Sequence, residues 1–211
     1  MLVLVVNAGS SSLKYQLVDT ESAVVWASGL VERIGEAESQ ITHRTRIRGG
    51  EDAAMQEYVV SVDIPDHKAA FHAVTEAFAR TGEVAEVGEL VGVGHRVVQG
   101  ADQFTEPTIV TQEVIDVIRD LIPLAPLHNP ANLTGIEVAI ELFPQATQVA
   151  VFDTAFHQTM PPEAYRYAIP YPLYVRHKIR RYGFHGTSHR YVAYRYRILT
   201  GKSYDDTNII T

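Results

Sequence analysis

The sequence predicts an α/β fold in which a mixed β-sheet carries helices on its faces. Residues 2–62 contain short apolar segments separated by polar turns, which is typical of antiparallel strands joined as hairpins. Residues 66–152 alternate between helical and strand patterns, which is typical of crossover units. With 211 residues, of which 46% are hydrophobic, the chain is long enough to bury the core that such a sheet needs.

The first part of the chain predicts a hairpin and three further strands. Leu2–Val6 is a continuous apolar run and predicts a strand buried on both faces. Leu13–Asp19 alternates with period two, so we expect the chain to return as a second strand after a polar turn. The β pattern continues over Val24–Val31, Ile41–Ile47 and Glu57–Val62, with breaks at Gly35 and Gly49–Gly50.

Helices and strands then alternate. Asp66 is expected to cap a helix that ends at Arg80, because apolar residues recur on one helical face between them. The pattern next predicts a strand over Glu89–Val98, a helix over Thr111–Leu121, a helix over Pro130–Leu142 with Asn129 as its cap, and a strand over Gln148–Phe152.

The last part of the chain is predicted to leave this sheet. Four prolines between Pro161 and Pro172 indicate an irregular linker that leads into a second domain. A helix is expected after Ser188, with Gly186 in the preceding loop and Gly201 at its end, and Asn208–Thr211 predicts the start of another strand.

Composition excludes several classes of function. The formal net charge of -7 argues against sequence-independent binding to nucleic acid, which requires excess lysine and arginine. The chain has no cysteine, so it has no disulfide or thiolate zinc site. Its N-terminal apolar run is too short to span a membrane and lacks the features of a signal peptide. We therefore expect a cytoplasmic protein that binds neither nucleic acid nor membrane.

A loop rich in small polar residues follows the first predicted strand. In Asn7–Lys14, small residues allow the backbone to approach a ligand, N–H and hydroxyl groups can donate to phosphate oxygens, and the lysine supplies positive charge. The spacing is not that of a Walker A loop, and a strand follows where that motif requires a helix. A polar hairpin turn with an exposed lysine is the alternative interpretation.

Three further residues stand at the ends of predicted elements. Arg96, at the end of a strand, could bind a carboxylate or phosphoryl group with two hydrogen bonds, or it could simply extend into solvent. His128 precedes a helix, where backbone N–H groups favour anions, although its neighbours could equally serve as caps. Asp153 follows a buried strand, where α/β sheets bind ligands, or it caps a turn.

A glycine-flanked histidine lies in Tyr182–His189, just before the last predicted helix. His185 and His189 have the spacing of a zinc-binding pair, but no glutamate follows the first histidine and the two are not expected to share a helical face. A phosphate site at the start of the helix is the favoured interpretation.

Two of these segments resemble the signatures of one enzyme family. Val5–Lys14 resembles the N-terminal signature of the acetokinases, and Tyr182–His189 resembles their second signature. Acetokinases are carboxylate phosphotransferases in the superfamily of actin, hexokinase and the heat-shock chaperone ATPases. The resemblance extends over essentially the whole chain and implies a ribonuclease H-like, actin-type ATPase fold with ligands bound in a cleft between two domains.

The resemblance also implies domain boundaries. Residues 1–153 would form a complete N-terminal actin-like ATPase domain, and residues 154–211 would form a linker and the beginning of a truncated, nucleotide-binding domain. In the family, the strand expected at Asn208–Thr211 leads into a glycine-rich loop for ADP, and a second arginine and a metal-supporting glutamate follow. We therefore expect this chain to be inactive on its own.

Roles near the first loop follow from the resemblance. Asn7 resembles the residue that supports Mg²⁺, and Lys14 resembles the one assigned to ATP. Ser10 and Ser12 correspond to loop hydroxyls that approach the phosphates.

Roles in the other segments follow in the same way. Arg96 resembles the arginine that binds the substrate carboxylate or phosphoryl group, and Asp153 resembles the active-site acid. His185 resembles the residue that stabilises the transition state, and His128 a histidine that lines the site. The chain departs from the family at Gln99, where a histidine is usual, and this departure affects the expected support of the arginine.

The resemblance implies reversible, Mg²⁺-dependent transfer of a phosphoryl group from ATP to acetate, giving ADP and acetyl phosphate. Acetate has a pKa of about 4 to 5, similar to that of glutamate, so it is ionised at neutral pH and needs no general base. Asp153 is therefore expected to orient a metal, a water or Arg96. Propionate and butyrate kinases share these loops and remain alternatives, as does a fragment that only binds a ligand or partner. A homodimer is a further family expectation.

Overall fold

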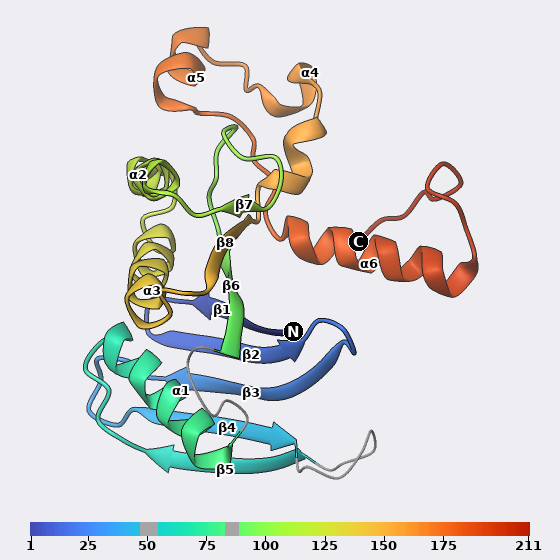
Figure 1. Cartoon of the computed structure of the whole chain (residues 1–211). Coiled ribbons are helices and arrows are strands. Elements are labelled where there is room, and N and C mark those ends of the chain that lie inside the picture. The colour runs from blue at the N-terminus through green and yellow to red at the C-terminus, as the bar shows by residue number, and fades with distance from the viewer. Residues whose placement is uncertain (47–54, 83–88) are drawn as a thin grey trace.

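The computed structural model describes residues 1–46, 55–82 and 89–211, whose strands form one mixed sheet (Figure 1). The order across this 8-stranded sheet is β5-β4-β3-β2-β1-β6-β8-β7. β1 to β5 are joined as antiparallel neighbours, whereas β1, β6 and β8 are parallel. The strands are β1 (Leu2–Ala8), β2 (Ser12–Asp19), β3 (Val24–Glu32), β4 (Gln40–Arg46), β5 (Met55–Ser61), β6 (Leu90–Val97), β7 (Thr108–Ile109) and β8 (Thr147–Phe152).

Helices α1 and α3 contact each other on one face of this sheet, and α2 packs on α3 (Figure 1). α6 contacts the end of β8 and the neighbouring short helix η3, and it extends away from the sheet. The helices are α1 (His67–Thr81), α2 (Gln112–Asp120), η2 (Ile122–Leu124), α3 (Asn129–Leu142), η3 (Ala155–Thr159), α4 (Pro162–Tyr165), α5 (Tyr171–His177) and α6 (Gly186–Thr200). The predicted α/β class with a mixed sheet and flanking helices is confirmed.

The core lies between α1, α2, α3 and a single face of the sheet. Alternate β1 residues Leu4 and Val6 are almost fully buried there, whereas Val5, on the opposite face, is 43% exposed. The prediction that β1 is buried on both faces was therefore wrong. The connections from β5 to β6 and from β6 to β8 run in the same direction along the sheet, and right-handed crossovers of that kind place their helices on one face. We call the other face of β1 to β4 and β6 the open face.

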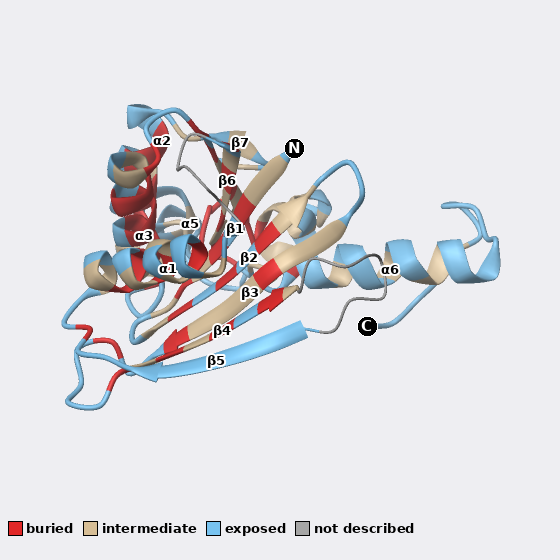
Figure 2. Cartoon of the chain, turned by 60° about the horizontal axis from the view of Figure 1, so that its bottom comes forward, coloured by how far each residue is buried: buried red, intermediate tan, exposed pale blue. Residues whose placement is uncertain are grey.

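Figure 2 shows the resulting distribution of burial. Buried positions gather where α1 and α3 meet the sheet, whereas β5 and most of α6 are exposed. Asp66 caps α1 as predicted, because its side chain accepts a hydrogen bond from the N–H of Ala69 at 2.8 Å. Across residues 1–46, 55–82 and 89–211, no helix is both long enough and apolar enough to cross a membrane.

Four local predictions need correction. The residue at the N-cap of α3 is His128, and Asn129 is instead the first helical residue. The proline-rich stretch is not simply irregular, since it contains α4 and the start of α5. Gly186 begins α6 and does not precede it. Residues 208–211 form no strand in the described chain.

The short strand β7 was not predicted, because two residues are too few to show a period. The predicted break at Gly49–Gly50 lies outside the described residues.

Candidate functional site

Lys14, Asn7 and Arg96 form a row across three neighbouring strands of the open face. Asn7 of β1 pairs with Lys14 of β2. β1 is parallel to β6 on its other side, and Val6 pairs with His95 there, so the next residue of each strand, Asn7 and Arg96, faces the same side. Strand register thus brings together residues from two sequence motifs that are far apart in the chain.

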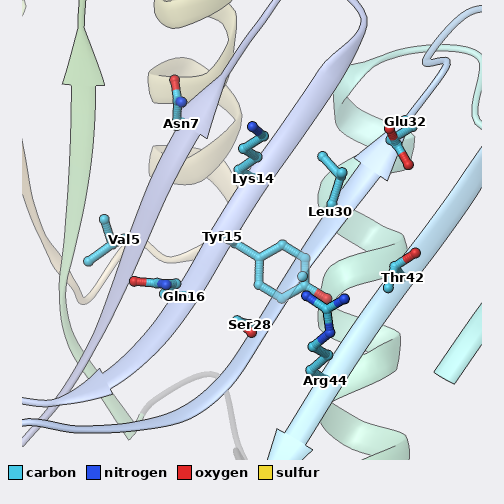
Figure 3. A pocket seen from close by; sticks show the side chains of 11 residues that line it. Val5, Asn7, Lys14, Tyr15, Gln16, Ser28, Leu30, Glu32, Thr42 and Arg44 are labelled. Atoms are coloured by element: carbon cyan, nitrogen blue, oxygen red, sulfur yellow. The ribbon is translucent and has the colours of Figure 1, made fainter. Parts of the chain in front are cut away.

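A pocket of about 550 Å³ opens on the same face beside this row (Figure 3). Asn7 and Lys14 line it together with residues of β2 to β4, whereas Arg96 does not line it. Arg44, on the far side of the pocket, donates to Glu57 at 2.6 Å. Lys14 forms no ion pair with any residue that the structure describes, so its charge is available to an anionic ligand.

Arg96 is held by the carboxylate of Asp153, which directly follows β8. Its Nε lies 3.1 Å from both carboxylate oxygens, and Nη2 lies 2.7 Å from Oδ2. The Asp153 side chain is only 2% exposed, whereas that of Arg96 is 38% exposed. The backbone N–H of Asp153 donates to the carbonyl of Val97 at 2.9 Å, which fixes the carboxylate beside β6. The guanidinium is therefore oriented from its buried side and accessible from the other.

The second signature segment meets Asp153 through the backbone of Gly186. The N–H of Gly186 donates to the carbonyl of Asp153 at 3.0 Å. A Cβ added to Gly186 would lie 2.4 Å from that oxygen, so the close approach requires glycine at this position. His185, which precedes it, adopts a left-handed conformation with φ of 58° and has an exposed side chain. The structure thus brings the loop that contains His185 to Asp153. The imidazole of His185 forms no hydrogen bond with another residue that the structure describes.

His157 is a neighbour of this loop to which the sequence assigned no role. Its ring packs against the backbone of Gly183, where an added Cβ would lie 2.0 Å from the imidazole, and its centroid is 5.6 Å from that of His189. Burial, and secondly the charge of His189, lower the pKa of His157. Only spatial packing identifies this residue, because nothing in its local sequence distinguishes it.

The remaining predicted residues, Ser10, Ser12 and His128, lie near the same ends of β1 and β6, and Ser12 is the first residue of β2. Ser10 is exposed in the turn between β1 and β2, which closes with a 2.7 Å hydrogen bond from the N–H of Gly9 to the carbonyl of Ser12. His67 of α1, which the sequence analysis missed, contacts the carbonyl of Gly9 through Nε2 at 2.6 Å. His128 is exposed at the start of α3, and its side chain makes no capping hydrogen bond.

Gln99 supports the turn after β6 and not the arginine. Its side chain is buried, and its Oε1 accepts a hydrogen bond from the N–H of Ala101 at 2.8 Å. Ala101 has a φ of 49°, so this bond stabilises a left-handed residue. In the described chain, Gln99 forms no hydrogen bond with Arg96, whose orientation comes from Asp153.

Asn7 is the residue of this row that could support a metal ion. Within the described ranges, no group of three or more histidine, aspartate or glutamate side chains is arranged to hold an ion. Asn7 offers one carboxamide oxygen on the open face. Such an oxygen suits Mg²⁺, which usually takes few protein ligands and binds mainly through phosphate oxygens and water. Asn7 therefore fits a supporting role, although it does not form a metal site by itself.

Comparison with known proteins identifies the relatives of this chain. The model of the Acetokinase family matches residues 2–211. Acetate kinase from Thermotoga maritima is 47% identical over 213 residues, which cover 100% of this chain and 51% of that protein. Acetate kinase from Clavibacter sepedonicus is 53% identical over 209 residues, which cover 99% of this chain and 51% of that protein.

Solved structures give the same result. The crystal structure of Porphyromonas gingivalis acetate kinase matches with a TM-score of 0.86 and 43% identity, over 98% of this chain and 50% of that one. A propionate kinase from Francisella tularensis matches with a TM-score of 0.85 and 35% identity, over 96% of this chain and 50% of that one. The chain spans about half the length of the relatives that it matches.

Proposed function

Because the chain belongs to the acetokinase family, we propose that it supplies the carboxylate-binding half of an acetate kinase, which transfers a phosphoryl group from ATP to acetate reversibly. The observation that carries this proposal is the guanidinium of Arg96, oriented by buried Asp153 and aligned with Asn7 and Lys14. This guanidinium supplies local positive charge on a chain whose net charge is -7.

The chemistry of phosphoryl transfer suits this arrangement. The reaction depends mainly on holding the reactants in line and on neutralising charge on the phosphoryl oxygens. Asp153 engages Nε and Nη2 of Arg96, so Nη1 and the second hydrogen of Nη2 remain to bind acetate or the transferred group. Because acetate is already ionised, Asp153 acts by positioning Arg96 and removes no proton.

The loop residues would bind the nucleotide and its metal. Ser10 and Ser12 would donate to phosphate oxygens, and Lys14 would neutralise phosphate charge. Asn7 would support Mg²⁺, which neutralises charge on the ATP phosphates when it is bound.

The remaining assigned residues lie around the reacting group. His185 would donate to the transferred phosphoryl group, and its place beside Asp153 through the Gly186 hydrogen bond supports this role. His128 would line the carboxylate site from the start of α3.

Domain organisation and assembly are part of the same proposal. Residues 1–153 would form the first domain, and residues 154–211 the linker and the beginning of the nucleotide-binding domain. The departure of α6 from the sheet supports its assignment to the second of these ranges (Figure 1). The protein would act in the cytoplasm as a homodimer.

Propionate is the second candidate substrate, because the structure also matches a propionate kinase. One methylene in an apolar pocket changes the free energy of binding by about 1–3 kcal/mol. A small difference in the shape of the pocket would therefore be enough to change the preference between acetate and propionate. The higher identity to proteins named acetate kinase favours acetate.

A hydroxamate assay tests the proposed function. It would measure acyl phosphate formed from ATP by a polypeptide that carries these residues and extends to the length of the relatives. We expect turnover with acetate, lower kcat/KM with propionate, and a loss of about 10³-fold or more in Arg96→Ala, as for other arginines that stabilise phosphoryl transfer. Arg119→Ala, which removes two exposed ion pairs, is the control.

The same assay on the isolated chain tests whether it is active alone. Negligible turnover is expected, because the nucleotide side of the site would be incomplete. Turnover near that of the longer polypeptide would refute this expectation, and an absence of acyl phosphate from the longer polypeptide would refute the proposed function.

A further inference from the structure

The carboxamide of Asn132 lies between the ends of β1 and β6. Asn132 is on the first turns of α3 and is 4% exposed. Its Oδ1 accepts a hydrogen bond from the N–H of Val98 at 3.0 Å, and its Nδ2 donates to the carbonyl of Ala8 at 2.7 Å. One side chain thus satisfies a donor that follows β6 and an acceptor at the end of β1.

The two groups that Asn132 bridges are those that would otherwise bond to each other. The parallel register places Val6 opposite His95, and its continuation would place Ala8 opposite Val97. In a parallel ladder, the carbonyl of a residue accepts from the residue after its partner, so Ala8 would accept directly from Val98. The carboxamide occupies the place of that bond and holds the strand ends apart.

Asn129, one turn earlier on α3, fixes the loop that follows. It is fully buried, and its side chain accepts from the N–H of Gln99 at 3.1 Å and donates to the carbonyl of Gln99 at 3.0 Å. The two asparagines therefore hold consecutive residues after β6 against the rigid start of a 14-residue helix.

We propose that Asn132 is a positioning residue of the anion site, a spacer that sets the separation between Asn7 on β1 and Arg96 on β6. Asn7 directly precedes Ala8, and Arg96 lies two residues before Val98, so the width of the gap determines how far apart the carboxamide and the guanidinium stand. The assignment rests on the proposed function, since acetyl phosphate is the ligand expected at this site.

The first test measures the Kd of acetyl phosphate for the 211-residue chain. Asn132→Leu has a similar volume and can make neither hydrogen bond, so we expect binding to weaken about tenfold or more, as for the loss of a well-placed hydrogen bond to a charged group. Thr134→Ala, on an exposed position of the same helix, is the matched control and should change Kd by less than about twofold.

A second variant gives a signature that a purely structural role would not produce. In Asn132→Asp, a protonated carboxyl group offers one donor and one acceptor, as the carboxamide does. A carboxylate cannot donate to Ala8. Burial raises the pKa of such a carboxyl group, so we expect wild-type affinity near pH 5 and weaker binding, relative to wild type, near pH 8. This variant also keeps the test decisive if Asn132→Leu does not fold.

The outcomes separate this inference from the proposed function. If the wild-type chain binds acetyl phosphate and the Asn132 variants bind it equally well at all pH values, the spacer role is overturned. If the wild-type chain does not bind it, the proposed function fails, and the Arg96 Nε–H resonance in the ligand-free chain tests the spacer instead. A shift of that resonance in the Asn132 variants but not in Thr134→Ala supports the spacer, and an unmoved resonance refutes it.

Discussion

The carboxylate of Asp153 receives three hydrogen bonds from the guanidinium of Arg96 across the parallel strands β6 and β8. The acid is almost fully buried and the arginine is partly exposed. Hydrogen bonds between oppositely charged groups of this kind are stronger and more directional than neutral ones. The pair is therefore a fixed cationic group, presented to the open face from a buried anchor.

Asp153→Asn tests this anchoring. The amide retains one acceptor but loses the charge and one acceptor oxygen, so Arg96 should become mobile and bind acetyl phosphate about tenfold less tightly. Titration calorimetry on the chain measures the change. Asp116→Asn, which neutralises one of the two exposed carboxylates paired with Arg119, is the matched control and should leave the affinity unchanged.

The pH dependence of the variant distinguishes positioning from proton transfer. If Asp153 only orients Arg96, the pH–rate profile of a longer, active polypeptide keeps its shape in Asp153→Asn while the rate falls. Disappearance of a rate-controlling pKa would show that Asp153 transfers a proton.

Gly186→Ala tests the contact between the second signature segment and Asp153. The added Cβ would lie 2.4 Å from the Asp153 carbonyl, so the start of α6 must move away. Overpacking of this kind costs about 1–3 kcal/mol, and we expect a lower free energy of unfolding in urea. Displacement of His185 should also weaken acetyl phosphate binding.

Gly94, which lies in β6, provides the control for this substitution. Gly94→Ala places its Cβ where nothing lies within 4 Å, so it should preserve both stability and binding. Equal behaviour of the two alanine variants would contradict the close approach seen at Gly186.

His95 should make the chain less stable in mild acid. Burial lowers the pKa of His95 from its usual 6.5, against a smaller opposing effect of the hydrogen bond with Gln148. The Gln148 amide donates to the carbonyls of Phe143 and Ala146, so its oxygen faces His95 and accepts from Nε2–H at 2.8 Å. Below pH 6.5 the unfolded chain binds a proton that the folded chain resists.

The free energy of unfolding should consequently fall as pH decreases from 6.5 toward the lowered pKa of His95, and should be insensitive to this group above that range. Urea unfolding between neutral and acidic pH measures the slope. His95→Gln should reduce the slope, because glutamine does not titrate, whereas His72→Gln on the exposed surface of α1 should retain it. An unchanged slope in His95→Gln would exclude His95 as its source.

Local patterns predicted most of the sheet and its helices. The hairpin of β1 and β2 and the Asp66 cap of α1 depend on neighbouring residues, so they are visible in the sequence. The helices in the proline-rich stretch were missed because proline is tolerated in the first turn of a helix, and Pro162 and Pro172 both occupy such positions. Here proline content alone was a misleading signal.

The open face could not be predicted from the apolar run of β1. Leu2–Val6 has the composition of a strand covered on both sides, but burial depends on where the crossover helices pass. Both crossovers pass over the same face, so Val5 remains exposed. The pocket beside Asn7 and Lys14 exists because no described helix covers that face.

The functional groups are evident in the sequence: a small polar loop with Lys14, an arginine at the end of a strand and an acid after an apolar strand. Which of these groups meet depends on the fold of the whole chain. Arg96 and Asp153 are 57 residues apart, and Asn132 and Ala8 are 124 residues apart. These contacts depend on parallel strand register and on the seating of α3, which arise from packing across the whole sheet and leave no local pattern in the chain.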